Sequence, residues 1–116
     1  MPGMTPTQLL TVAVLNWPGT SVRIGERGEY AFDVGAAELG HLHDDRVAHF
    51  GFPRAIGQEL RDAGRVGPHP VNPHSPKLAA RAIASDADVE DILALLRLNY
   101  ERVAAEDDVE RFSALT

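Results

Sequence analysis

The chain has 116 residues, 44% of them hydrophobic and 24% charged, which is enough for one domain with a single hydrophobic core. Its formal net charge is −6, from 17 acidic and 11 basic side chains, and no basic stripe stands out, so nucleic-acid binding is disfavoured. The absence of cysteine excludes disulfides, thiolate metal sites and a cysteine nucleophile.

No apolar run reaches the ~18 residues needed to cross a bilayer, so we expect no membrane partner. The N-terminal stretch MPGMTPTQLLTVAVLNW is a poor signal peptide, because no basic residue precedes its apolar segment and no small-residue cleavage site follows. A cytoplasmic protein is therefore expected. The sequence leaves the oligomeric state open, with a homodimer as one option.

A helix followed by strands is predicted for the first half of the chain. Thr5 and Pro6 are typical of an N-cap and a first helical position, and the sequence WPG stops the helix. Alternating apolar residues then predict strands in TSVRIG (20–25), EYAFDV (29–34), ELGHLH (38–43) and RVAHFGF (46–52). Gly28 suits a hairpin between the first two strands, and the DD sequence suits a turn between the last two.

The second half is predicted to contain a helix, a loop, a strand and a helix. Pro53 opens the helix PRAIGQELRDAG, and Gly64 closes it. The segment from Arg65 to Pro76 holds four prolines, so we expect no regular element there. KLAARAI fits a last strand.

The segment SDADVEDILALLRLNYERVAAE is the clearest helix in the sequence. Ser85 and Asp88 form a capping-box-like pair at its start. One apolar face is formed by Val89, Ile92, Leu93, Leu96, Tyr100 and Val103. We expect this face to dock on the sheet. The tail from residue 105 to 116 is expected either to extend the helix in a frayed form or to be disordered.

This order of elements predicts a single α+β domain over residues 1–104. One antiparallel sheet of four to five strands would be covered on one face by about three helices.

Two histidines one residue apart form the first candidate site. On a strand, His41 and His43 point the same way, ~7 Å apart, and can share a metal ion. A third ligand would come from His49, His69, His74 or Glu38, and zinc or iron would suit such a site. The alternative is a histidine pair on a half-solvated face without a function. No second motif fixes the remaining ligands, so we expect no tightly bound metal.

Acid–base chemistry fits these residues better than metal binding, because histidine titrates near neutral pH and neighbouring charges can tune it. Arg54 begins a helix just after a strand, where it could hold an anion. The alternative for Arg54 is a surface ion pair with Glu59 or Asp62. We predict that four side chains converge on one cleft between the sheet and the Pro-rich segment: His41, His43, Arg54 and His69. The rival prediction scatters them over a solvated surface.

Three segments, ELGHLH, FPRAIGQELRDAGRVGPHPVNP and DADVEDILALLRLNYERV, together resemble the luciferase-domain family. These are small proteins, common in actinobacteria and related to part of the fungal luciferases. Typical members carry an E-L-G-H-x-H strand, a Pro-Arg helix start, a helix ending in A-G-R and a P-H-H-V-x-P loop. The resemblance covers Val22 to Val103.

The resemblance implies a cofactor-free oxygenase-like or small-molecule-binding domain that acts on a polyketide-like enol, since fungal luciferases oxidise a hydroxylated pyrone with molecular oxygen. The residues at matching positions are Glu38, His41, His43, Pro53, Arg54, Pro68, His69 and Pro73. The implied roles are proton acceptor for His41 or His43, assistance from His69, and enolate binding by Arg54. Substrate binding is expected of Glu38, Pro68 and His74.

Some residues depart from the family pattern. Pro70 stands where a second histidine is usual, His74 replaces an acidic residue, and PKLAARAI lacks a Gly-Trp pair. These departures favour the alternative of a binding or accessory module without turnover. The last strand and helix also resemble MmcQ/YjbR-like proteins, which implies a related α+β fold, while the negative charge disfavours the DNA binding proposed for those proteins.

Overall fold

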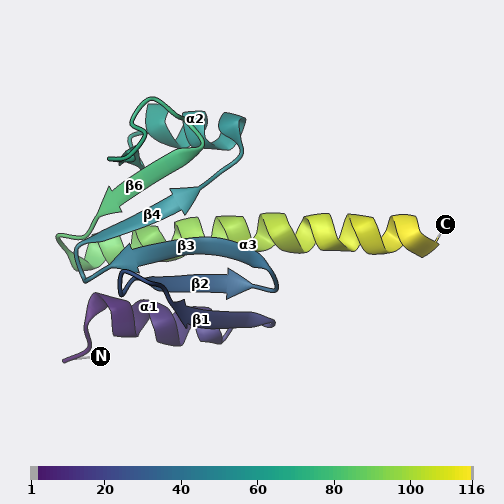
Figure 1. Ribbon diagram of the computed structural model, residues 1–116, viewed down its shortest axis with the longest axis horizontal. Coiled ribbons are helices and arrows are strands. Elements are labelled where there is room, and N and C mark those ends of the chain that lie inside the picture. Colours follow the sequence, from purple (N-terminus) through teal and green to yellow (C-terminus); the bar gives the residue numbers. More distant parts are fainter. Residues whose placement is uncertain (1–2, 116) are drawn as a thin grey trace.

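A six-stranded antiparallel sheet forms the centre of the computed structural model, which describes the backbone of residues 3–115 and the side chains of residues 3–107 (Figure 1). The elements are α1 (Pro6–Leu15), β1 (Thr20–Ile24), β2 (Tyr30–Val34), β3 (Ala37–His43), β4 (Val47–Gly51), α2 (Arg54–Asp62), β5 (Gly67–Pro68), β6 (Leu78–Ala82) and α3 (Asp86–Leu115). The strand order is β1-β2-β3-β4-β6-β5. The predicted α+β class is confirmed.

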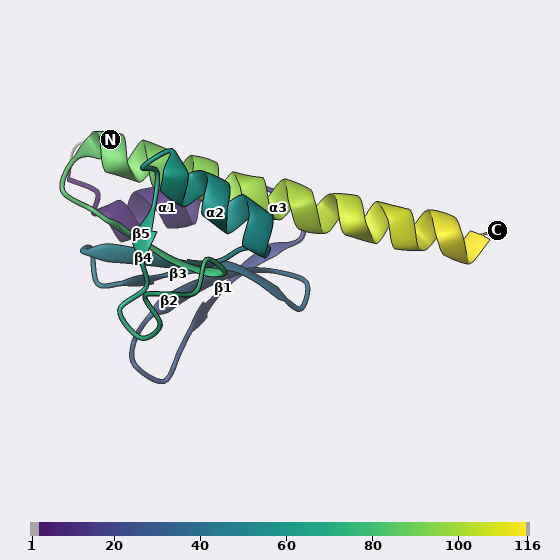
Figure 2. The same cartoon turned by 90° about the horizontal axis from the view of Figure 1, so that it is seen from above.

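The three helices lie on one face of the sheet (Figure 2). On the other face lies the hairpin loop, residues 25–29 between β1 and β2. The Pro-rich loop, residues 69–77 between β5 and β6, begins on that face, while its end contacts α2, where Arg61 donates to the carbonyl oxygen of Ser75. The hydrophobic core fills the space between helices and sheet, with Phe32, Leu42, Ile92 and Leu96 fully buried. Packing the helices on one face leaves the other face free for polar side chains.

Local sequence signals account for the ends of several elements. Thr5 and Gln8 form a capping box at the start of α1, each side chain accepting a hydrogen bond from the other residue's backbone N–H. Gly28 has a φ of 79° in the hairpin loop, and Gly64 has a φ of 73° just beyond α2. These are the positions where the sequence predicted a turn and a helix end.

Helix α3 begins at the predicted capping pair. The Asp88 carboxylate accepts hydrogen bonds from the backbone N–H groups of Ala84 and Ser85, and Arg81 of β6 binds both Asp88 and Asp91. The pKa of Asp88 is lowered, chiefly by its hydrogen bond from Arg81. This network holds the start of α3 against the end of β6.

The apolar face of α3 packs on the sheet as predicted. Within that face, Val89, Ile92, Leu96 and Val103 are buried, and Leu93 and Tyr100 are partly buried. Two further buried residues of α3 were not predicted. Leu95 is fully buried, and the Asn99 amide donates hydrogen bonds of 3.0 Å to the carbonyl oxygens of Leu39 and Gly51.

The sheet has one more strand than expected, because β5 lies in the segment predicted to hold no regular element. Gly67 and Pro68 pair with Ala80 and Ala79 of β6 at the sheet edge. An edge strand tolerates proline, because no further strand lies beside it to accept a hydrogen bond from the N–H that proline lacks.

Helix α3 continues to Leu115, and its end projects beyond the sheet (Figure 1). The tail of residues 105–116, which the sequence predicted to be either a frayed extension of the helix or disordered, falls largely within this helix. Thr116 and the side chains of residues 108–115 lie outside the described part of the chain. Among the described residues, no helix is long and apolar enough to cross a membrane.

Candidate functional site

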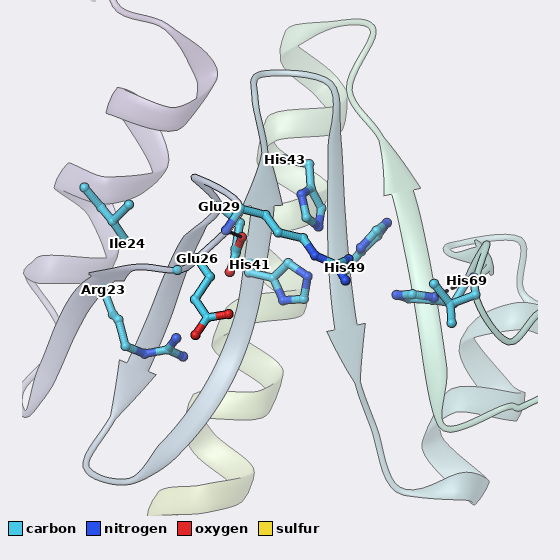
Figure 3. Close-up of a pocket in the computed structure, with 11 residues that line it drawn as sticks. Arg23, Ile24, Glu26, Glu29, His41, His43, His49 and His69 are labelled. Carbon is cyan, nitrogen blue, oxygen red and sulfur yellow. Dashed lines mark hydrogen bonds between the residues drawn. The ribbon is translucent and has the colours of Figure 1, made fainter.

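Four histidines lie together on the sheet face opposite the helices (Figure 3). His41 and His43 come from β3, His49 from β4, and His69 from the start of the Pro-rich loop. Strand alternation explains this placement, because Leu42, between the first two histidines, is buried in the core on the helix side.

The register of the sheet lines these residues up. His41 of β3 pairs with His49 of β4, and His49 pairs in turn with Ala80 of β6. Ala80 also pairs with Gly67 of β5, two residues before His69. Directly paired residues share a face, so the small side chain of Ala80 leaves room above β6 for His69 to approach His49.

The imidazole rings contact one another edge to face. Ring centroids are 4.9 Å apart for His41 and His43, 5.3 Å for His41 and His49, and 4.7 Å for His43 and His49. His69 adds a fourth ring, with its centroid 4.3 Å from that of His49. One ring nitrogen from each of His41, His43 and His49 lies within 4.8 Å of the other two.

A carboxylate orients the first of these rings. Nδ1 of His41 lies 2.9 Å from Oε2 of Glu38, and because a carboxylate only accepts, Nδ1 carries the proton and donates it. This leaves the Nε2 lone pair of His41 free. Arg23 donates to Glu38 at 3.2 Å and to Asp33 at 3.1 Å, which fixes the carboxylate in turn. The hydrogen bond with His41 is the main reason that the pKa of Glu38 is lowered.

Hydrogen bonding favours the opposite tautomer in His69. The backbone N–H of Val71 donates to Nδ1 of His69 at 3.1 Å, so in the neutral ring Nε2 carries the proton. The ring points toward His49 in Figure 3. His69 therefore presents a hydrogen-bond donor to the site.

Burial keeps the centre of the cluster neutral. His49 is 8% exposed, and desolvation, followed by the charges of His69, His43 and His41, lowers its pKa to about 4. Desolvation and the charges of His41 and His43 also lower the pKa of His69. A second positive charge in this cluster is unfavourable because the rings are so close.

The histidines open onto a pocket of about 670 Å³. Its other wall is the end of β1 and the hairpin loop, which contribute Arg23, Ile24, Gly25, Glu26, Arg27 and Glu29, and Val71 comes from the Pro-rich loop. The pKa of Glu29 is lowered by hydrogen bonds from its own backbone N–H and that of Arg27. The pocket thus combines hydrogen-bond-accepting imidazoles with both acidic and basic side chains.

The structure brings three of the four predicted catalytic residues to this pocket: His41, His43 and His69. Glu38, expected to bind substrate, does not line the pocket and instead contacts His41.

Arg54, Pro68 and His74 are exposed and are not among the lining residues. Arg54 lies outside because α2 packs with the other helices, on the far side of the sheet. Among the described side chains Arg54 makes no ion pair, so the alternative pairing with Glu59 or Asp62 is not seen either.

The role of His49 was underestimated from the sequence, and the contribution of the hairpin loop to the pocket was not predicted. His49 entered only as one of several third ligands, yet it is the ring that contacts the other three. Its position depends on the length of the β3–β4 turn, which the sequence alone does not fix. A turn of residues 44–46 pairs His41 with His49, whereas a two-residue turn would pair His41 with Ala48.

We expect the stability of the metal-free protein to fall as the pH drops from about 6.5 to about 4. An unfolded histidine has a pKa near 6.5, and the folded pKa of His49 is about 4, so the unfolded chain binds more protons in this window. The contribution is complete above pH 6.5 and lost toward pH 4, with a size on the order of 2 kcal/mol. Urea unfolding in EDTA across this range measures it.

The control for this titration is a pair of substitutions. His49→Gln should flatten the pH dependence, while His74→Gln, at an exposed position outside the pocket, should leave it unchanged. Taking the difference between variants removes the contribution of carboxylates such as Asp88 and Glu38, which also destabilise the fold as they are protonated. Equal slopes for the wild type and His49→Gln would contradict the expectation.

Comparison with known proteins assigns the chain to a family. Residues 36–99, more than half of the chain, match the luciferase domain. This span contains all four pocket histidines and begins after the hairpin loop. Searches of curated proteins and of solved structures return no match. On the strength of the match over residues 36–99, the chain belongs to the luciferase-domain family.

Proposed function

We propose that the four-histidine pocket binds a small, hydroxyl-bearing molecule of enol type, and that the domain acts on it as an oxygenase-like enzyme. The observation that carries the proposal is the convergence of four imidazole rings on one pocket. His49 is buried with a lowered pKa, and Glu38 fixes the Nε2 lone pair of His41 as an acceptor. A pocket rich in acceptors favours a ligand that donates hydrogen bonds.

The size of the pocket and its walls fit a molecule of one or two rings. A volume of about 670 Å³ lies within the range of roughly 300–1,000 Å³ usual for small-molecule sites. Ile24 and Val71 add apolar surface beside the charged groups. The Nε2–H of His69 offers a donor to a carbonyl oxygen of the same ligand.

Oxygenase-like turnover would begin with proton transfer from the enol hydroxyl to an imidazole nitrogen, for which His41 is the best-oriented base. The carbon of the resulting enolate adds to dioxygen, forming a C–O bond and a peroxide anion. The imidazolium then returns its proton to the peroxide oxygen. The step consumes one enol and one dioxygen and yields one hydroperoxide.

A non-catalytic binding module is the second candidate, because two of the arginines considered for the site are not available to stabilise the negative charge of an enolate. Arg54 lies away from the site, and Arg23 is engaged by Asp33 and Glu38. Among the described lining residues, Arg27 is the remaining cation that could stabilise an enolate.

The experiment is a titration of the full chain with a hydroxylated 2-pyrone, followed by calorimetry, histidine NMR and dissolved-oxygen measurements. We expect binding that perturbs the pocket histidines and weakens at least tenfold in His49→Gln, but not in His74→Gln, a change of at least about 1.4 kcal/mol. Oxygen uptake with binding supports the enzyme. Binding without oxygen uptake supports the binding module, and the absence of binding contradicts both.

A further inference from the structure

We propose that His41, His43 and His49 together bind one divalent first-row transition-metal ion, for which zinc is the probe. The proposal deepens the proposed function and rests on the same pocket. The metal would supply the positive charge that an ionised enol requires and that the side chains of the pocket largely lack.

The three ligands are placed by the sheet rather than by flexible loops. His41 and His43 lie two apart on β3, and His49 lies directly across on β4. Their nearest ring nitrogens are within 4.8 Å of one another. Tetrahedral zinc with Zn–N bonds of 2.0–2.1 Å requires nitrogens about 3.3 Å apart, so modest rotation of the rings about their side-chain bonds closes the site.

The hydrogen bond between Glu38 and His41 is of the kind that metal-bound histidines usually make. A ligating imidazole commonly donates its other N–H to a carboxylate, which fixes the tautomer and makes the ligand more basic. Here Nδ1 of His41 donates to Glu38 at 2.9 Å, and Nε2 is left for the metal. Arg23 holds the carboxylate from its other side at 3.2 Å.

The fourth coordination position would face the pocket, because all three ligands project from the sheet on one side. His69 does not fill it, since Val71 donates to its Nδ1 and Nε2 carries a proton. It would instead donate to an oxygen bound at that position. Three neutral ligands leave the charge of the metal uncompensated, and Glu26 and Glu29 of the pocket wall balance the charges of Arg23 and Arg27 beside them.

An open position at a metal with three histidine ligands is typical of catalytic rather than structural sites. The ligand's enol oxygen would bind there, and the metal would lower its pKa by acting as a Lewis acid. A metal held by these three histidines would therefore take over from the histidine base, because it would favour the ionised form of the enol at the open position.

The test uses the full chain without a tag, stripped with EDTA and titrated with zinc in competition with a chromophoric chelator. We expect one zinc per chain. Affinity should fall at least 100-fold in His41→Gln and in His49→Gln, and about 10–100-fold in Glu38→Gln. The matched control is His74→Gln, an exposed histidine outside the pocket, which should change affinity less than twofold.

Thermal unfolding of the metal-free variants checks that each is folded. Should a variant fail to fold, X-ray absorption of the zinc-loaded wild type decides the matter by counting imidazole ligands. Three imidazoles support the proposal, while one or none overturns it. Equal zinc affinity of the wild type and His49→Gln also overturns the proposal, whether both proteins bind one zinc tightly or both bind it weakly.

Pyrone binding to both the EDTA-treated and the zinc-loaded wild type separates the two proposals. Pyrone binding without zinc binding overturns the metal proposal and leaves the proposed function standing. Zinc binding without pyrone binding supports the metal site and contradicts the proposed ligand. Tighter pyrone binding to the zinc-loaded protein supports both.

Discussion

Replacing Leu96 by aspartate is expected to abolish the cooperative unfolding of the domain. Leu96 is 1% exposed and packs between α3 and the sheet, where its Cδ2 comes so near Gly40 that a Cβ added there would lie 2.9 Å away. A carboxylate at this position would be buried without a partner, at a cost of several kcal/mol, which is a large part of the stability of a small domain.

Circular dichroism during heating and near-ultraviolet spectra measure this effect. The matched control is Ala94→Asp, two residues earlier on α3 at an exposed position, which should unfold cooperatively and close to the wild type. Leu96→Ala should remain folded but lose about 2–5 kcal/mol. A Leu96→Asp protein with a sharp, native-like transition would show that α3 does not form part of the core.

Gly57→Ala is expected to destabilise the fold although it raises helix propensity. Gly57 is buried in α2, and a Cβ there would collide with the carbonyl oxygen of Pro76 and lie 2.9 Å from its carbonyl carbon. These are backbone atoms, so no side-chain rotation relieves the clash. Alanine would gain about 1 kcal/mol in propensity, yet the overpacking should leave a net loss of about 2 kcal/mol.

Urea unfolding at pH 7 measures the change. Gln58→Ala, next to Gly57 on the exposed side of the same helix, should shift stability by less than about 0.5 kcal/mol. A Gly57→Ala protein as stable as the wild type would show that α2 does not lie as close to the backbone of Pro76 as the structure places it. This approach is also fixed by Arg61, which donates to the carbonyl oxygens of Ser75 and Leu78.

The elements of the fold were largely predictable because their signals are local. The Thr5 cap, the glycines at positive φ and the Ser85–Asp88 pair each depend on a few neighbouring residues. Leu95 and Asn99 escaped prediction because the buried face of α3 is wider than the stripe of spaced apolar residues. A buried asparagine is recognisable only when its partners, two carbonyl groups of distant strands, are known.

The site was predictable only in part because it depends on register. His41 and His43 share a face by alternation, which any strand provides. The position of His49 beside them depends on the turn that precedes β4. In this turn Asp44 has a left-handed conformation with φ 53°, and the Asp45 carboxylate accepts hydrogen bonds from the backbone and side chain of Thr7. No local pattern distinguishes this three-residue turn from a two-residue one, and the difference moves His49 to the opposite face.

The separation of helices and pocket onto opposite faces has a consequence for engineering the domain. The hairpin loop lies on the histidine face and carries none of the helix-side core that Phe32, Ile92 and Leu96 form, whereas the end of the Pro-rich loop packs against α2. Grafting new sequences into the hairpin loop should therefore change ligand choice while the scaffold keeps its melting temperature. The hairpin loop is suited to this change because it contributes Gly25, Glu26, Arg27 and Glu29 to the pocket lining and no histidine.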